Sequence, residues 1–323
     1  MNVFDYVEDA ALLLGRNLGI GSAEALVIVC DNETEPFGRL LERAASTLGV
    51  ASRLVIFPPT GRHKAEPPSY VSEAMEQASA VVAVTRWSLV HTEARRAANR
   101  AGARVLCVSD MQVDLLERGV LTVDVDAIYP VLADLSGRLS AASKAELITG
   151  GGAAKLEFAL SERTAIDQAG ICKEPGTWTA LPCIETAICP IEHSTAGTIV
   201  VDGAVVPGGP LREPLEIKIE DGRIVEIRGD ERAAQLNALM RAEGGYGVVE
   251  LGIGLNPRAE LGKHFAEDEA VWGTVHVGVG DGESFGSTFR ASQHLDLVTM
   301  CPTLLLDGQP VITDGILEGA GDS

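Results

Sequence analysis

The sequence predicts an α/β domain with a parallel sheet, followed by an α+β domain whose sheet is mostly antiparallel. The first half of the 323-residue chain alternates apolar runs with amphipathic segments, a pattern typical of parallel strands joined by helices. In the second half, strand-like segments follow one another with one helix among them, which favours antiparallel pairing. We therefore predict a Rossmann-like domain over residues 1–143 and a second domain over residues 144–323.

The N-terminal half begins with an amphipathic stretch over residues 3–18 that predicts a helix ending before Gly19. The continuous apolar run over residues 25–30 predicts a buried parallel strand. No G-x-G-x-x-G motif follows this run, so a nucleotide-binding domain is not predicted. Further strands are predicted at residues 53–57, 79–84 and 104–108, and helices at 37–48, 69–77, 91–100 and from about 130.

The C-terminal half is dominated by short strand signals and tight turns. Dipeptides such as Asp221-Gly222 and Asp307-Gly308 are typical of hairpin turns, because aspartate and glycine accept a positive φ. One helix is predicted over residues 231–242, and a flexible tail is predicted after Glu318. Strands are predicted at residues 145–149, 155–160, 185–189, 198–201, 215–220, 223–228, 248–252, 273–279 and 303–306.

Composition excludes several classes of partner. The formal net charge of −20 disfavours nucleic acid and anionic membranes as partners. No apolar run approaches the length of a membrane span, and acidic residues near the N-terminus do not fit a signal peptide, so a cytoplasmic protein is expected. The six cysteines show no C-x-x-C spacing, and disulfides are not predicted. The expected partners are a small molecule or a short peptide, and a homodimer is one expected assembly.

Four side chains with metal-binding chemistry lie on apolar segments of the second half: Glu250, His276, His294 and Asp296. If the segment QHLDLV is a strand, His294 and Asp296 leave the same face roughly 6 to 7 Å apart, close enough to share a cation. A buried carboxylate or imidazole is costly unless it is paired or bound to a metal. The cluster therefore predicts a metal site, although each residue alone fits an ordinary hydrogen-bonded strand position.

The segments ELGIGLNP, LGKHFAEDEAVWGTVHVGVGD, SFGS and SQHLD, with PTLLLDGQPVITDG after them, resemble the aminopeptidase T type of metallopeptidase. The upstream segment LPCIETAICPIEHSTAGTIVVDG resembles the part of that family in which a glutamate follows a Leu-Pro pair, and this resemblance adds Glu185 to the expected ligands. The resemblance covers most of residues 125–323. A ring-cleaving 2,5-dihydroxypyridine dioxygenase branch shares the scaffold and the His-x-Asp pair.

Two chemistries fit Glu185, Glu250, His276, His294 and Asp296. Five ligands suffice for two bridged divalent ions, zinc, cobalt or manganese, that activate water for hydrolysis of an amide or peptide bond. The alternative is a non-haem Fe(II) triad in a dioxygenase. The resemblance implies that this branch has histidine at the position of Glu250 and no glutamate at that of Glu185, so the metallohydrolase is the main prediction. The tyrosine that longer aminopeptidases add to the groups around the metal has no evident counterpart in this sequence, where Glu283 and Phe285 follow His276.

A third hypothesis is a metal-free binding module that keeps the same scaffold. The first half supplies one further candidate, His91, which follows the strand predicted at residues 79–84. Parallel sheets present ligands at the carboxyl ends of their strands, and the segment resembles the one that supplies a base-like histidine in the dioxygenase branch. We therefore predict His91 as a catalytic acid or base, against the alternative that it only begins a helix.

Overall fold

The structure is a computed structural model that describes residues 2–319, so the tail predicted after Glu318 lies, apart from Gly319, outside the described residues. Contacts divide the chain into two compact units. Unit 1 comprises residues 1–125 and 168–182, and unit 2 comprises residues 126–167 and 183–323. The predicted fold class is confirmed, because one unit has a parallel sheet with helices and the other has mostly antiparallel sheets.

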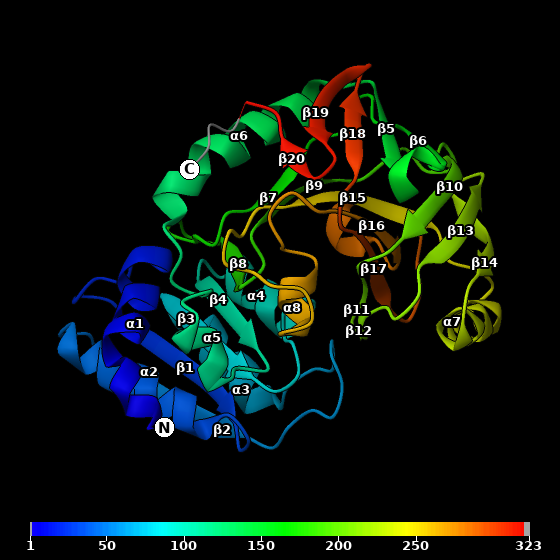
Figure 1. Cartoon of the computed structure of the whole chain (residues 1–323). Helices are drawn as coiled ribbons and strands as arrows, with labels where there is room; N and C mark the ends of the chain where they lie inside the picture. Colours follow the sequence, from blue (N-terminus) through cyan, green and yellow to red (C-terminus); the bar gives the residue numbers. More distant parts are fainter. Residues whose placement is uncertain (1, 320–323) are drawn as a thin grey trace. The chain divides into compact units, whose positions relative to one another are not determined.

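Unit 1 is built on a five-stranded parallel sheet with strand order β2-β1-β3-β4-β8. Its central strands are fully buried and rich in β-branched residues, as expected of a sheet covered on both faces. Figure 1 shows β8 beside β4 at the end of this sheet. The strands are β1 (Leu26–Asp31), β2 (Ser52–Phe57), β3 (Ala80–Thr85), β4 (Arg104–Ser109) and β8 (Trp178–Leu181).

Helices pack on both faces of this sheet. Apolar residues of α3 and α4 join alternate residues of the strands in one buried cluster, while Gly38 of α2 lies against Cys30 on β1, where an added Cβ would be 2.7 Å from the sulfur. The helix predicted over residues 3–18 forms as three consecutive turns, η1 (Val3–Tyr6), α1 (Val7–Leu12) and the π-helical η2 (Leu13–Asn17). The other helices are α2 (Glu35–Thr47), α3 (Ser69–Glu76), α4 (Glu93–Arg100) and α5 (Val113–Glu117).

Unit 2 contains two sheets, of eight and seven strands. The first has the order β14-β13-β10-β6-β5-β18-β19-β20, and Figure 1 shows its last strands, in red, beside β5. Its strands are β5 (Lys144–Thr149), β6 (Ala154–Ala159), β10 (Ala196–Val201), β13 (Leu215–Glu220), β14 (Arg223–Arg228), β18 (Thr303–Leu306), β19 (Gln309–Thr313) and β20 (Ile316–Leu317).

The seven-stranded sheet has the order β12-β11-β17-β16-β15-β9-β7 and carries every predicted ligand. Its strands are β7 (Ile166–Gln168), β9 (Glu185–Ile188), β11 (Ala204–Val206), β12 (Gly209–Pro210), β15 (Val248–Gly254), β16 (Val275–Gly280) and β17 (His294–Thr299). The helical segments of unit 2 are α6 (Val125–Ala141), η3 (Gly150–Gly152), α7 (Glu231–Ala242), α8 (Phe265–Asp268) and η4 (Glu283–Phe285). Both predicted Asp-Gly turns have positive φ at both residues, as a type I′ hairpin requires.

The division of the chain differs from the predicted boundary after residue 143. Helix α6 belongs to unit 2, where the Arg138 guanidinium donates to the Pro310 carbonyl at 3.0 Å. Strand β8 lies in the second half of the sequence but extends the parallel sheet of unit 1. The chain therefore passes between the two units three times instead of once.

Within residues 2–319, no helix combines the length and apolarity that a membrane span requires.

Candidate metal centre

Four neighbouring strands of the seven-stranded sheet bring the five predicted ligands together. Their order is β17, β16, β15 and β9, and they carry respectively His294 with Asp296, His276, Glu250, and Glu185. Each ligand faces a glycine across the strand pair, because Glu250 and Asp296 flank Gly278 and His276 pairs with Gly252. The same holds at the edges, where Glu185 pairs with Gly254 and His294 with Gly280.

The facing glycines leave the room that the ligand side chains occupy. A Cβ added at Gly252 would lie 2.0 Å from the Nε2 atom of His276. A Cβ added at Gly278 would lie 2.7 Å from the Oε2 atom of Glu250 and 2.9 Å from the Cε1 atom of His294. These distances are far below van der Waals contact, so only glycine allows the ligands to lie over this face of the sheet.

A β-bulge in β15 lies immediately before Glu250. Val248 pairs with Val279, but Glu250 pairs with Gly278, so Val249 is an extra residue in β15. From Glu250 onwards the register is regular: Gly252, two residues after Glu250, pairs with His276, so Glu250 and His276 leave the same face of the sheet. The regular segment after the bulge therefore brings this carboxylate to the same face as the two imidazoles.

The ligands form two groups that share Glu250. Glu185, Glu250 and His276 form one group and Glu250, His294 and Asp296 form the other, with ligand atoms within 4.8 Å of one another in each. One oxygen of Glu250 lies 3.5 Å from the Nε2 atom of His276, and its other oxygen lies 3.0 Å from the Nε2 atom of His294. Glu185 lies 3.1 Å from His276, and Asp296 lies 3.0 Å from His294.

Burial and neighbouring charge shift the protonation of this cluster. Burial opposes the charged form of His276, but hydrogen bonds with Glu185 and Glu250 raise its pKa well above the usual value. The pKa of His294 is raised for the same reason by Asp296 and Glu250. Burial also opposes ionisation of Asp296, yet His294 holds its pKa well below the usual range. The Asp296 carboxylate therefore favours its ionised form, which can bind a cation.

The orientation of His294 is set by a backbone carbonyl. Its Nδ1 atom lies 2.9 Å from the carbonyl oxygen of Asp281, and an oxygen at this distance requires Nδ1 to carry the proton. Nε2 then faces Glu250 and Asp296 and donates to them while the imidazole is charged, and loss of this proton leaves the Nε2 lone pair that a metal ligand needs. The donor set of two imidazoles and three carboxylates fits a divalent metal ion.

Sequence analysis missed a further carboxylate in this cluster, that of Glu269. Burial and the carboxylates of Asp296 and Glu185 raise its pKa well above the usual value, and its side chain hydrogen-bonds with Asp296. Its neighbours Glu267 and Asp268 are buried, but they accept hydrogen bonds from the backbone amides of Glu260 and Gly262 at 3.0 and 2.6 Å. Nothing in the run of three acids distinguishes the member that reaches the metal cluster.

His91 lies in unit 1, two residues before α4 begins at Glu93. Thr92 caps that helix through its hydroxyl, which accepts from the Arg95 amide at 3.3 Å. Glu66 caps it as well, because its two oxygens accept from the Glu93 and Ala94 amides at 2.6 and 3.0 Å. His91 is half-buried and its carbonyl accepts from Arg96 at 3.3 Å. Its catalytic role stays a prediction.

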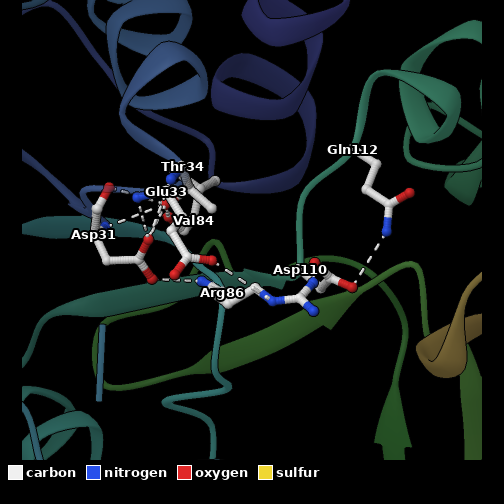
Figure 2. A network of polar contacts seen from close by, with 7 residues as sticks. All are labelled: Asp31, Glu33, Thr34, Val84, Arg86, Asp110 and Gln112. Carbon is white, nitrogen blue, oxygen red and sulfur yellow. Dashed lines mark hydrogen bonds and ion pairs between the residues drawn. The ribbon is translucent and has the colours of Figure 1, made fainter. Parts of the chain in front are cut away.

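The carboxyl edge of the unit 1 sheet carries a separate polar network, shown in Figure 2. The buried Asp31 carboxylate, at the end of β1, accepts from the backbone amides of Glu33, Thr34 and Arg86 at 3.0, 3.1 and 2.6 Å. Arg86, after β3, forms an ion pair with Asp110, after β4. These groups bind one another, so the network fixes the loops that follow three neighbouring strands.

The fold and the clustered ligands define a metal-binding enzyme scaffold, and comparison with known proteins identifies its family. A family model for 2,5-dihydroxypyridine 5,6-dioxygenase matches residues 19–319. The chain therefore belongs to the 2,5-dihydroxypyridine 5,6-dioxygenase family. No curated protein sequence matches the chain.

Two solved structures share the fold across nearly the whole chain. One is a 2,5-dihydroxypyridine dioxygenase from Pseudomonas putida KT2440, with a TM-score of 0.86, 20% identity, and 99% of each chain covered. The other is wild-type AmpT from Thermus thermophilus, with a TM-score of 0.69, 15% identity, and 97% of this chain and 99% of that chain covered. Both relationships expected from the sequence are confirmed, as is a divalent metal cofactor.

The family match changes the balance between the two predicted chemistries. The metallohydrolase was the main prediction, because this chain has Glu185 and Glu250. The family model and the fold comparison with the higher TM-score favour the dioxygenase alternative instead. Both chemistries require an enzyme with a divalent metal ion, and this part of the prediction is unchanged.

Proposed function

We propose that this protein is a non-haem Fe(II) dioxygenase that cleaves the ring of a dihydroxylated pyridine or a closely related heteroaromatic compound. The family match over residues 19–319 carries this proposal. The cluster supports it, because His276, His294 and a carboxylate provide the two imidazoles and one acid typical of non-haem iron sites. A bound Fe(II) ion would supply the activation of dioxygen, both atoms of which enter the ring-opened product.

The chain's own residues would hold the metal and control protons. The Asp281 carbonyl holds the Nδ1 proton of His294, so that Nε2 is the nitrogen that would lose its proton and bind the cation. Burial and the carboxylates of Asp296 and Glu185 raise the pKa of Glu269, which favours its protonated form beside the ligands. Glu250 lies between both imidazoles and neutralises positive charge at the centre of the cluster.

The test is oxygen consumption by protein loaded anaerobically with Fe(II). We expect 2,5-dihydroxypyridine to be consumed with one O₂ per ring, together with loss of the ring's ultraviolet absorbance. His294→Ala should abolish both signals, whereas His193→Ala should not, because His193 lies in an exposed loop paired with Asp221. An Fe(II)-loaded wild type that leaves oxygen and dihydroxylated rings untouched would refute the proposal.

A two-metal hydrolase is the second candidate, and the position of Glu250 favours it. Each oxygen of Glu250 faces a different histidine, which is the arrangement of a carboxylate that bridges two ions. Glu185 would complete one ion's ligands and Asp296 the other's. The function would then be hydrolysis of an amide or peptide bond with zinc, cobalt or manganese.

Glu185→Gln separates the two candidates. In the dioxygenase, iron bound near one per chain and oxygen uptake should both survive loss of this carboxylate. In the hydrolase, metal content should fall from two ions per chain towards one, and cleavage of an aminoacyl substrate should be lost. Metal analysis of the purified wild type and variant gives the two ratios directly.

His91 remains our proposed acid or base. Its replacement, His91→Ala, should lower turnover by about 10² to 10⁴ while metal content and the unfolding temperature stay near wild type. Unchanged turnover would leave His91 as a residue that only precedes helix α4, and loss of metal would make it a ligand.

A further inference from the structure

An aromatic ring lies against one of the metal ligands. The ring of Phe285, in η4, is nearly parallel to the imidazole of His294, with 21° between the planes and 5.4 Å between the centroids. Parallel rings in contact are separated by roughly 3.5 Å, so this centroid distance means that the rings are offset. Part of the Phe285 face therefore extends beyond the imidazole, and Phe285 is only partly buried.

The turn that carries Phe285 is fixed by hydrogen bonds and close packing. The Gly282 carbonyl accepts from the amides of Phe285 and Ser287 at 3.1 and 3.0 Å. Gly282 itself packs against β15, where an added Cβ would lie 2.7 Å from the Cβ of Val249, the residue before Glu250. The Phe285 backbone is therefore held in place relative to the strand that carries the shared ligand.

Phe285 is not needed to set the tautomer of His294. The Asp281 carbonyl already holds the Nδ1 proton, and Glu250 and Asp296 already contact Nε2. What the ring adds is a flat apolar surface beside a cluster of carboxylates. Such a surface suits a flat ligand, because offset parallel stacking is a preferred arrangement of aromatic rings.

We propose that Phe285 is the platform on which the substrate ring stacks, and that it makes the site select flat aromatic ligands. This inference rests on the proposed function, in which the substrate is a heteroaromatic ring. Phe285 contacts the substrate in this role and is a specificity-determining residue. Stacking of one ring pair corresponds to about a 2- to 12-fold difference in affinity.

Two chelators that each bind a metal ion through two oxygen atoms test the stacking role of Phe285 without turnover. Tropolone is a flat ring, and acetohydroxamate has no ring. Their affinities are measured from the visible spectrum of the Co(II)-loaded protein, for wild type and for Phe285→Leu, Phe285→Tyr and Phe4→Leu. Phe4 is a matched control, because it is also partly exposed but lies in unit 1.

We expect Phe285→Leu to weaken the affinity for tropolone by about 2- to 12-fold. The affinity for acetohydroxamate and the cobalt content should not change. Phe285→Tyr should restore tropolone binding, and Phe4→Leu should match wild type. An equal loss of affinity for both chelators, or loss of cobalt, would show that Phe285 only positions His294. Unchanged affinities would show that Phe285 has no role in ligand binding. Either result overturns the platform. A selective tropolone effect in a protein that cleaves no dihydroxypyridine would instead refute the proposed function alone.

Discussion

Glu192 anchors the far side of the turn that carries Phe285. Its Oε1 atom accepts from the Thr288 amide at 2.8 Å, and Arg163 forms an ion pair with it. Burial opposes its charge, but these partners lower its pKa to about 2. Since the ordinary pKa of glutamate is about 4.3, the folded state favours the ionised form. The resulting stabilisation is complete above about pH 4.3 and is lost as the pH falls through about 2.

Glu192→Gln should therefore destabilise the protein in a pH-dependent way. At pH 7 we expect the free energy of unfolding to fall by about 1–3 kcal/mol, because hydrogen bonds to a charged group are lost. The difference between wild type and variant should shrink below about pH 4.3 and vanish near pH 2. Urea unfolding at several pH values measures it. Glu226→Gln, which removes an exposed partner of Arg228, is the control and should change stability little. A difference that stays constant down to pH 2 would contradict this account.

At the residue scale, sequence predicted the ligand types better than their surroundings. Glu250, His276, His294 and Asp296 stand out because charged side chains interrupt apolar strands, and their cost there implies a partner. Glu269 does not stand out, because it follows two other acids in a segment with no strand pattern. Its place beside Asp296 depends on tertiary structure alone.

At the scale of the strand, the ligands alternate with glycines, which leave room for the ligand side chains on one face of the sheet. The segments ELGIG and HVGVG each place a ligand and two glycines on one face of their strands. The strands themselves could be predicted because these ligands lie between apolar residues such as Val249, Leu251 and Val277. The register between them and the bulge at Val249 were not predictable, because they depend on pairing between strands.

Gly252→Ala tests this arrangement. The added Cβ would lie 2.0 Å from the Nε2 atom of His276, so the imidazole must move away from Glu185 and Glu250. We expect metal affinity to fall by roughly 10- to 100-fold, as when groups that orient a ligand are lost. The assay is metal retained after dialysis against a buffered concentration of the free ion, with thermal unfolding to show that the variant folds. Gly137→Ala, in α6 with no atom within 4 Å of the new Cβ, is the matched control. Wild-type metal affinity in Gly252→Ala would mean that the imidazole can bind the ion from another position.

At the scale of the whole molecule, the chain's path between the two units could not be predicted from the sequence. The order of strands and helices predicted the two kinds of sheet. However, β8 is only Trp178–Leu181, follows Pro175 and Gly176, and lies among the strands of the second half. A strand of that length gives no sequence signal of the sheet that it will join. Its assignment to unit 1 comes from parallel pairing with β4.

Residues 168–182 satisfy polar groups in the interior of unit 1. The buried Asn17 side chain donates to the Gly170 carbonyl at 2.7 Å, and the Asn99 side chain donates to the Thr177 carbonyl at 2.8 Å. The guanidinium of Arg95 lies 4.5 Å from the centroid of the Trp178 ring. A fragment that lacks this segment would lose these contacts, including the acceptor of the buried Asn17 amide, and would expose the edge of β4, which favours aggregation.

We therefore expect a fragment of residues 1–143, which ends at the boundary predicted from sequence, to aggregate or to unfold without a cooperative transition. Residues 1–125 joined to 168–182 should fold, if a flexible glycine-serine linker as long as the replaced segment 126–167 connects them. Circular dichroism during urea unfolding distinguishes the two fragments, and light scattering reports aggregation. As a control, the joined fragment with Trp178→Ala should unfold at lower urea, because the ring that Arg95 contacts is removed. Cooperative unfolding of the 1–143 fragment with the stability of the joined fragment would show that β8 is dispensable, and that the parallel sheet is complete with four strands.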